Sequence, residues 1–498
     1  MSLDKLERAI ESQTAAELRD TLAAMNRSEQ YKPKNEHSPL TDLWNCERFC
    51  EKYAEDFKWC EKLGGWFLWD GTSWQNIGDK DTALMRWAKD YVKALGVYAG
   101  SIQDKRLGTH AIKTESSGKL KAIIDLAKSE VPIAHDVFDR NNHLLNCKNG
   151  TLDLNTGVLR RAERGDYITK AIDVWYEPTA QCPIWLNFLD QVFMGDQALV
   201  DYIQRALGYC LSGYTHEQKF FICYGNGRNG KSTLLKHVMY ILGQSYASGT
   251  PAATMLEQEG NNTMQSVAAL KGMRLVVLSE FDNGKTLSSA TVKNMTGGEP
   301  VVARHLYHSE FTYIPTYKFW MTTNYKPRIK DVGSLGIWRR LVLIPFLYTI
   351  PADKVDYGLD VKLAAEYEGI LAWAVAGYRK WKADGLPQLE ALKKAVVCYQ
   401  GDSDIIGQFL EDCQDLEANP GIAEVSVVEF MKAFAEWCME NSIKHHPGRS
   451  AILDYMDKKG FGRPARDNSS MFRGKLAWKG IAIKRVSWAK PTQEWGQE

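Results

Sequence analysis

The sequence predicts an α/β protein built on a largely parallel sheet. Between residues 185 and 390, short apolar runs of strand length alternate with longer segments of helical periodicity. One of these runs, Phe220 to Tyr224, leads through a glycine-rich loop into a helical pattern. That strand–loop–helix order is typical of parallel α/β sheets with a ligand site at the carboxyl end of a strand.

The glycine-rich loop contains the octapeptide Gly225-x-x-x-x-Gly230-Lys231-Ser232. Its glycines allow backbone N–H groups to face phosphate oxygens, the lysine supplies a positive charge for the β- and γ-phosphates, and the serine hydroxyl suits Mg²⁺. A chance match in a turn is the alternative, which the strand before the loop and the helix after it disfavour. We therefore predict an ATP and Mg²⁺ site formed by Gly225, Asn226, Gly227, Arg228, Asn229, Gly230, Lys231, Ser232 and Thr233.

The composition is that of an ordinary globular protein. The chain has 498 residues, of which 44% are hydrophobic and 25% charged, a length that suits about three domains. No apolar stretch approaches a membrane span, and the charged start Met1 to Arg8 does not resemble a signal peptide, so we expect a cytoplasmic protein without a membrane partner. The ten cysteines form no Cys-x-x-Cys pair, and the spacing of Cys46, Cys50 and Cys60 matches no common zinc frame.

Charge is nearly balanced over the whole chain, with a formal net charge of +1. This value argues against polyanion binding by the entire surface, so contacts with nucleic acid are expected from local basic patches. Residues 304–340 carry seven Lys or Arg against two acids, and residues 444–485 carry eleven against three.

Four segments follow one another along the chain. Residues 1–39 combine an amphipathic helical pattern with a polar linker, and residues 40–184 mix helix and strand patterns. Residues 185–390 form the α/β domain around the phosphate loop. A charged and polar stretch, Cys398 to Asp404, then separates a last block within residues 400–498.

Local patterns add detail at both ends of the chain. The turn-rich segment Asn149 to Gly157 predicts a hairpin. In the last block, helical patterns at 405–413, 425–441 and 449–459 precede a predicted strand pair, 475–479 with 480–485. This order suits a winged helix that docks on DNA. A cluster of cations there would follow a phosphate backbone or simply favour solubility: Arg463, Arg466, Arg473 and Lys475.

Later apolar runs end in polar residues that suit nucleotide chemistry. The run from Arg274 ends at Glu280, 49 residues after Lys231, where a carboxylate could hold Mg²⁺ or the attacking water. The next run ends at Asn324, whose amide could orient water or sense the γ-phosphate, although it could also form a turn before Pro327.

Two adjacent arginines, Arg339 and Arg340, precede a further apolar run. Such a pair is usually solvated surface. At the edge of a subunit, however, one guanidinium could reach the γ-phosphate held by a neighbour as an arginine finger.

Taken together, these motifs resemble the superfamily 3 helicases, ring-forming AAA+ ATPases, and most closely the phage/plasmid and poxvirus-type primase-helicase group. Gly225–Ser232 resembles its Walker A motif, Leu275–Glu280 its Walker B motif and Trp320–Asn324 its motif C. Leu287–Arg304 resembles its B-prime motif. Segments upstream, including Trp66–Trp74, resemble the domain that precedes the ATPase in this group.

The resemblance implies an AAA+ P-loop ATPase core of superfamily 3 type, with a mixed α/β N-terminal domain and a C-terminal winged-helix domain. It implies a homo-hexamer in which Lys231, Glu280, Asn324 and Arg340 carry out ATP hydrolysis, with Ser232 and Glu280 on the metal and Arg340 as the better finger candidate. One departure is Ser279, where many superfamily 3 proteins have a second acid. A second is the short segment before residue 40, from which we expect a helicase without primase activity.

A hairpin before motif C grips single-stranded DNA in this family. The matching segment here carries Arg304, Tyr307 and His308, which suit phosphate contact and base stacking. Without the resemblance, a solvated hairpin would be the simpler interpretation, and Arg304 could instead serve a structural role near the nucleotide.

We therefore expect an ATP-dependent replicative DNA helicase of a phage, prophage or plasmid-like element, working in the bacterial host cytoplasm on single-stranded and forked DNA, a replication origin included. The alternative is an AAA+ replication initiator or helicase loader that remodels DNA without processive unwinding. A third hypothesis is an ATP-dependent binding module unconnected with nucleic acid.

Overall fold

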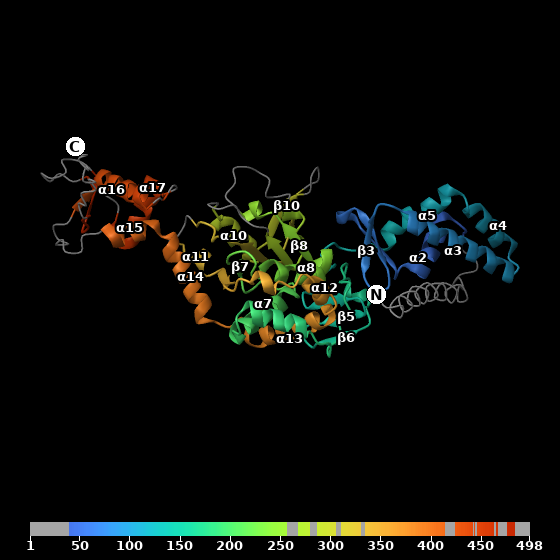
Figure 1. Cartoon of the computed structure of the whole chain (residues 1–498). Coiled ribbons are helices and arrows are strands. Elements are labelled where there is room, and N and C mark those ends of the chain that lie inside the picture. Colours follow the sequence, from blue (N-terminus) through green and yellow to red (C-terminus); the bar gives the residue numbers. More distant parts are fainter. Residues whose placement is uncertain are drawn as a thin grey trace, which may run out of the picture. The chain divides into compact units, whose positions relative to one another are not determined.

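The computed structural model describes residues 39–255, 267–278, 286–304, 310–329, 334–413, 424–441, 443, 446–462, 465–466 and 476–483. The chain divides into two compact units, residues 1–176 and residues 177–498. Figure 1 labels many of the elements of each unit.

Unit 1 combines helices with two small antiparallel sheets. The sheets have the strand orders β1-β2-β3 and β4-β5-β6, and the second contains the hairpin predicted at Asn149 to Gly157. The core of unit 1 includes the buried aromatic residues Phe49, Phe57, Trp66 and Tyr91. The elements are α2 (Asp42–Tyr53), β1 (Phe57–Cys60), η1 (Glu61–Leu63), β2 (Gly65–Trp69), β3 (Trp74–Gly78), α3 (Thr82–Ser101), α4 (Lys105–Thr114), α5 (Ser117–Glu130), β4 (Leu144–Cys147), β5 (Gly150–Asp153), β6 (Val158–Arg160) and η2 (Arg164–Asp166).

Unit 2 is centred on a five-stranded, entirely parallel sheet. Its strand order is β13-β7-β12-β9-β8, which confirms the predicted parallel α/β architecture. The strands are β7 (Phe220–Tyr224), β8 (Ala247–Thr250), β9 (Leu275–Leu278), β12 (Lys318–Thr323) and β13 (Leu341–Pro345). Strand β12 is buried along its whole length, as expected for a central strand that is covered on both faces.

Helices connect and cover these strands. Two of them, α7 and α13, lie side by side (Figure 1) because glycines remove the side chains between them. A Cβ added at Gly208 would clash with the backbone of α13, and one added at Gly377 with the backbone of Gln204. The helices are α6 (Pro183–Val192), α7 (Gln197–Cys210), α8 (Lys231–Tyr246), η3 (Ala252–Met255), α10 (Ser289–Thr296), α11 (Leu335–Trp338), η4 (Ala352–Lys354), α12 (Leu359–Ala364), α13 (Tyr367–Asp384) and α14 (Glu390–Ser403).

The polar stretch Cys398 to Asp404 is largely helical. It forms the end of α14, whose Leu392 and Tyr399 are buried, and Tyr399 belongs to the core of the sheet. The chain leaves helical geometry only at Asp404 (φ −86°, ψ 68°). The break before the last block therefore lies at the end of the stretch that the sequence suggested.

The last block has its own hydrophobic core around Phe409, Phe430 and Trp478. The predicted pairing of 475–479 with 480–485 is wrong for the described residues, because β16 pairs with β14 and β15 instead and Gly480 (φ +80°) turns the chain. The elements are α15 (Ile405–Cys413), β14 (Glu424–Ser426), α16 (Val427–Glu440), α17 (Arg449–Met456), η5 (Asp457–Phe461), β15 (Ala465–Arg466) and β16 (Leu476–Lys479).

Candidate nucleotide-binding site

The glycine-rich loop connects the carboxyl end of β7 to the first residue of α8. Gly225 (φ +147°) and Gly230 (φ +84°) adopt backbone angles that favour glycine. A Cβ added at Gly225 would clash with the backbone oxygen of Phe346, and one at Gly230 would lie 2.7 Å from Val192 Cγ2. Packing as well as backbone geometry therefore requires glycine at both positions.

Lys231 is buried at the start of this loop's helix, with 3% of its surface exposed. Among the described residues, its Nζ lies within hydrogen-bond distance of four acceptor oxygens, namely Gly225 O (2.6 Å), Asn226 O (3.2 Å), Asn229 Oδ1 (3.0 Å) and Asn324 Oδ1 (3.3 Å). The ammonium group is thus held near the N-terminus of the 16-residue helix α8. The helix dipole and this charge together favour an anion there.

Asn229 joins the loop to the end of β13. Its Nδ2 donates to Phe346 O (3.0 Å), and its Oδ1 accepts from Lys231. Backbone hydrogen bonds from Phe346 N to Tyr224 O and from Ile350 N to Arg228 O fasten the same two segments. The loop is therefore preformed against the chain that follows β13.

The rest of the predicted loop faces outward. Asn226, Gly227, Arg228 and Ser232 are exposed, while Thr233 is half-buried. Ser232, the predicted metal ligand, lies in the first turn of α8. Arg228 has a positive φ of +58°, a conformation that few non-glycine residues adopt.

Asn324 comes directly after β12, the neighbour of β7. The register pairs Thr323 with Tyr224, so Asn324 follows its strand at the same edge at which the loop follows β7. This explains its contact with Lys231, a closeness that the sequence spacing predicted. Glu280 lies outside the described residues, since the described part of β9 ends at Leu278, which pairs with Met321 of β12.

Arg339 and Arg340 lie at the opposite edge of the sheet, before β13 begins. Arg340 is 8% exposed. Its guanidinium donates to Gly336 O (2.7 Å), Thr296 Oγ1 (3.1 Å) and Gln218 Oε1 (3.5 Å), and burial lowers its pKa. Arg339, in contrast, is exposed. Of the two arginines, Arg339 is therefore the one whose side chain is better placed to contact another chain.

The hairpin predicted before Asn324 is present. Strands β10 (Val301–Arg304) and β11 (Glu310–Tyr313) pair in antiparallel fashion, with Arg304 opposite Glu310 at its described end. Arg304 is exposed. Tyr307 and His308 lie outside the described residues.

Cys46, Cys50 and Cys60 are buried thiols. Across the described ranges, no group of three His, Cys, Asp or Glu residues is arranged to hold a metal ion. In the same part of the chain, no helix has both the length and the apolar character needed to cross a bilayer.

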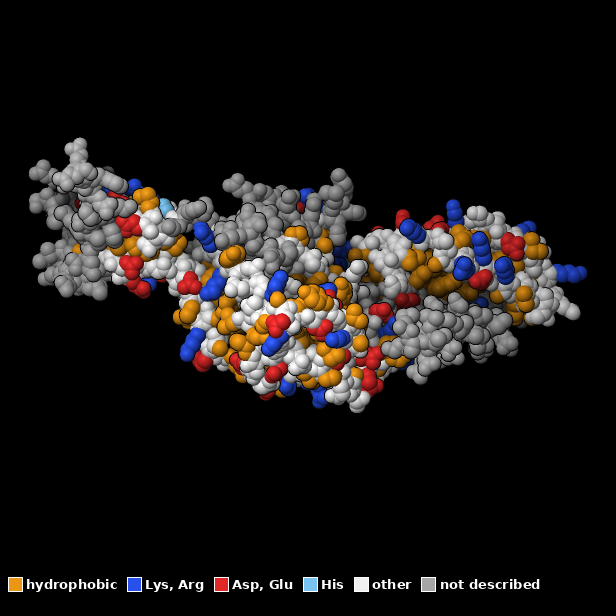
Figure 2. All heavy atoms as spheres, in the orientation of Figure 1, with side chains coloured by type: hydrophobic (Ala, Val, Ile, Leu, Met, Phe, Trp, Pro, Cys, Tyr) orange, Lys and Arg blue, Asp and Glu red, His pale blue; other side chains and the backbone are white. Residues whose placement is uncertain are grey.

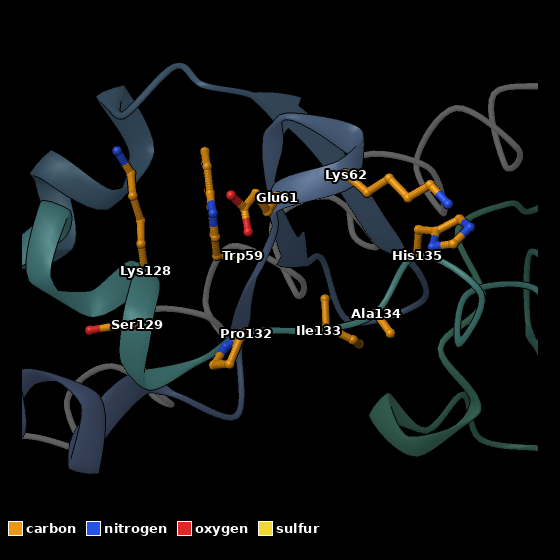
Figure 3. A pocket seen from close by; sticks show the side chains of 9 residues that line it. All are labelled: Trp59, Glu61, Lys62, Lys128, Ser129, Pro132, Ile133, Ala134 and His135. Carbon is orange, nitrogen blue, oxygen red and sulfur yellow. The ribbon is translucent and has the colours of Figure 1, made fainter. Parts of the chain in front are cut away.

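A pocket of about 740 Å³ lies in unit 1, which contains no part of the phosphate loop. Figure 3 shows Lys128 and Trp59 on one side and Lys62 beside His135 on the other. Lys128 Nζ lies 4.9 Å from the centre of the Trp59 ring and pairs with Asp125 at 2.9 Å. Part of the positive charge at this pocket is therefore already neutralised.

Residues that sequence reasoning missed hold the predicted ones in place. Gln218 and Thr296 fix Arg340, and the backbone of Phe346 fixes Asn229. Thr296 is part of the B-prime resemblance, which offered an indirect sign of importance. Nothing in the sequence pattern pointed to Gln218 or to the backbone oxygen of Phe346.

Two family models match parts of this chain. The family described as "D5 N terminal like" matches residues 46–194, and a family of unknown function (DUF5906) matches residues 223–340. The second match extends from the last residues of β7 to Arg340 and thus contains the loop and Asn324.

Similar curated proteins come from viruses. "Putative helicase L207/L206" of Acanthamoeba polyphaga mimivirus is 26% identical over 377 residues, 71% of this chain and 38% of that protein. "Putative primase C962R" of African swine fever virus (isolate Tick/Malawi/Lil 20-1/1983) is 23% identical over 335 residues, 62% of this chain and 34% of that protein. The chain thus spans well under half the length of these relatives.

A structure of similar fold is among the solved structures that match this chain. The apo structure of the NrS-1 C-terminal region matches with a TM-score of 0.51 at 15% identity, covering 89% of this chain and 100% of that one. The sequence matches relate the chain to viral proteins of the helicase and primase group.

Proposed function

We propose that this chain is the ATP-hydrolysing subunit of a DNA helicase of superfamily 3 AAA+ type. One observation carries the proposal. The strand order β13-β7-β12-β9-β8 puts the phosphate loop and Asn324 side by side at one edge of the sheet, with Lys231 Nζ 3.3 Å from Asn324 Oδ1. The similarity to proteins named as viral helicases agrees with it.

The loop fits a nucleoside triphosphate with Mg²⁺. Gly225 and Gly230 allow the loop the positive φ angles with which backbone N–H groups can face phosphate oxygens, and Lys231 would balance the phosphate charge. Ser232 and, outside the described residues, Glu280 would hold the metal, which supplies charge neutralisation at the transferring phosphoryl group. Asn324 would orient the attacking water or report on the γ-phosphate.

Hydrolysis in this proposal requires two subunits. Strand β13 separates Arg340 from the edge that carries the loop by five residues, a span of roughly 16 Å in extended chain. An arginine at that position cannot reach the phosphate site of its own subunit. Arg339 or Arg340 would instead complete the site of a neighbour in a ring, which we propose to be a homo-hexamer.

The DNA contacts are proposed from two places. The β10–β11 hairpin, with Arg304, Tyr307 and His308, would grip one strand inside the ring. The last block has the element order α15-β14-α16-α17-β15-β16 and a three-stranded antiparallel sheet, an arrangement that supports a winged helix docking on duplex DNA or on an origin.

The second candidate is an initiator or loader with the same ATP site, since the loop and Asn324 serve either function. A forked duplex distinguishes the two, because a helicase separates its strands under ATP turnover and a loader hydrolyses ATP without separating them.

The test of the ATP site is Lys231→Ala. Loss of the buried ammonium is expected to lower DNA-stimulated ATP turnover by about 100-fold or more. The matched control is Lys236→Ala on the same helix, a half-exposed lysine that pairs with Asp360, which should keep wild-type turnover. Undiminished DNA-stimulated turnover in a folded Lys231→Ala protein would sink the proposal.

A further inference from the structure

Helix α4 of unit 1 presents a cationic face. Lys105, Arg106 and Lys113 are exposed, and none of the ten residues of α4 is acidic. The opposite side of the helix is buried and consists of Leu107, His110, Ala111 and Thr114. The cations therefore lie on the one side of α4 that the core of unit 1 does not use.

The middle of this exposed face is uncharged. Thr109 is exposed, and Ile112 is 72% exposed. Helical periodicity places both between Lys105 and Arg106 at one end and Lys113 at the other. The result is a short helix with cations at both ends of its free face and a hydroxyl and an aliphatic side chain between them.

Positive charge in unit 1 is concentrated on the helical layer to which α4 belongs. From Thr82 to Glu130, which spans α3 to α5, there are nine Lys or Arg and five Asp or Glu. Residues 39–81 and 131–176 together have eleven Lys or Arg and fifteen Asp or Glu. Figure 2 shows Lys and Arg side chains, in blue, over the part of unit 1 that Figure 1 labels α3, α4 and α5.

The cations of α4 are not neutralised within the described part of unit 1. Lys119 pairs with Asp42 and Lys128 with Asp125, each at 2.9 Å. Among the described residues, neither Lys105, Arg106 nor Lys113 has such a carboxylate partner. Burial lowers the pKa of His110, and the charges of Lys119, Arg106 and Lys113 act in the same direction while that of Asp42 opposes them.

Several contacts hold helix α4, and with it the cationic face, in a fixed position. Asp104 caps α4 by accepting from Leu107 N at 2.9 Å. Small residues bring α3 and α4 together, since a Cβ added at Gly108 would lie 3.9 Å from Ala99 Cβ. His110 is also within hydrogen-bond distance of Asn45 in α2, at 2.9 Å. Little conformational entropy would be lost when this helix docks on a partner.

We propose that the exposed face of α4 is a docking surface for duplex DNA. An α-helix with its side chains is about 10–12 Å in diameter and fits the major groove, which is about 12 Å wide. Lys105, Arg106 and Lys113 contact phosphates on either side of the groove, and Thr109 and Ile112 face the base edges. The proposal rests on the proposed function only in that the chain acts on DNA, and it adds a contact outside the hairpin and the last block.

The experiment uses the full chain and a duplex of about 30 base pairs. The combined variant Lys105→Glu, Arg106→Glu and Lys113→Glu is expected to weaken duplex binding by at least about tenfold at low salt and to reduce the salt slope by about three. The control reverses three exposed cations of unit 1 outside α3 to α5, Lys80→Glu, Lys148→Glu and Arg161→Glu, and should keep wild-type affinity. Circular dichroism checks that both proteins fold.

A second measurement locates the contact directly. A photoreactive phenylalanine in place of Thr109 should crosslink to the duplex, whereas the same residue in place of Val158, 59% exposed on β6, should not. Unchanged affinity of the α4 variant together with no crosslink at position 109 overturns the proposal, as does a crosslink to single-stranded DNA alone. ATP turnover without DNA, measured on the unmodified chain, tests the ATP site separately.

Discussion

In the proposed ATP site, each oxygen that contacts Lys231 competes with the phosphates of the nucleotide. Among the described residues four oxygens contact Lys231 Nζ, and Asn229 supplies one of them while its amide nitrogen donates to Phe346 O. Because Asn229 is 3% exposed, its side chain has little freedom to turn away. The residue therefore links the charge at the phosphate site to the end of β13.

Asn229 should affect nucleotide binding in a way that depends on charge. Asn229→Ala removes both hydrogen bonds, whereas Asn229→Asp places a carboxylate beside the Lys231 ammonium and repels phosphate. We expect the Asp variant to raise the KM for ATP by about tenfold or more and the Ala variant to raise it less. Steady-state ATPase assays measure both values, and equal KM values in two folded variants would show that Asn229 only supports the loop.

The two glycines at the start of the loop should respond differently to a methyl group. Gly225→Ala meets a positive φ and the backbone oxygen of Phe346, so the free energy of unfolding should fall by about 3 kcal/mol. Gly227→Ala, with no atom within 4 Å of the added Cβ, should change it little. Urea titration compares the two, and similar losses would contradict the packing of the loop against β13.

At the scale of elements, the apolar runs predicted strands of the sheet, because a buried parallel strand is visible in the sequence as a short local run of apolar residues. Strands β7, β9, β12 and β13 all lie within runs recognised in the sequence. The wrong partner for β16 has a physical cause, since antiparallel pairing is decided by register and turns. The two-residue strand β15 gives too short a pattern to detect.

The sequence predicted those parts of the candidate site that directly follow a strand, and not the others. Loop and Asn324 meet because their strands are parallel neighbours, a consequence of topology that the motif order implied. The burial of Arg340 depends on Gln218 and Thr296, which approach it from different elements. No spacing rule reports such contacts, so the sequence favoured Arg340 as the finger although the structure buries it and exposes Arg339.

Lys318, on β12, should make stability depend on pH. It is 3% exposed, its Nζ donates to the backbone oxygens of Ser212 and Thr316, and burial lowers its pKa from 10.5 to about 7. Between these values the unfolded chain holds a proton that the folded chain has released, so the free energy of unfolding rises with pH. The slope from this group is at most about 1.4 kcal/mol per pH unit.

The comparison that isolates this group is Lys318→Met. Urea titrations at pH 7, 8 and 9 should show wild-type stability rising relative to the variant. In the variant, the backbone oxygens of Ser212 and Thr316 lose a donor at every pH. This loss lowers the free energy of unfolding of the variant by the same amount at each pH, so it does not affect the difference in slope between the two plots of stability against pH. Parallel curves would mean that Lys318 stays protonated in the folded protein throughout this range.

At the scale of the whole molecule, the polarity of the sheet is the reason why the proposed ATPase needs two subunits. Lys231 follows the carboxyl end of β7, and Arg339 and Arg340 precede the amino end of its neighbour β13. Each chain thus has the proposed phosphate site at one edge of the sheet and guanidinium groups at the other. ATP hydrolysis is then expected to be a property of adjacent subunits.

Mixing inactive proteins tests this arrangement. One protein carries Lys231→Ala and the other carries both Arg339→Ala and Arg340→Ala, so that the outcome does not depend on which arginine reaches across. Interfaces that combine an intact loop with intact arginines form in about a quarter of the sites of an equal mixture, and turnover should recover to about that fraction of wild type. ATPase assays after subunit exchange measure the recovery.

The double arginine variant must fold for this test, because Arg340 makes three hydrogen bonds within its own subunit. Its phosphate loop is intact, so it should bind a fluorescent ATP analogue as tightly as wild type while failing to hydrolyse ATP. Single variants then identify the finger, since only the arginine that acts across the interface abolishes turnover alone and restores it on mixing with Lys231→Ala. A variant that binds the analogue yet gives no recovery at any ratio would place both arginines outside the reaction.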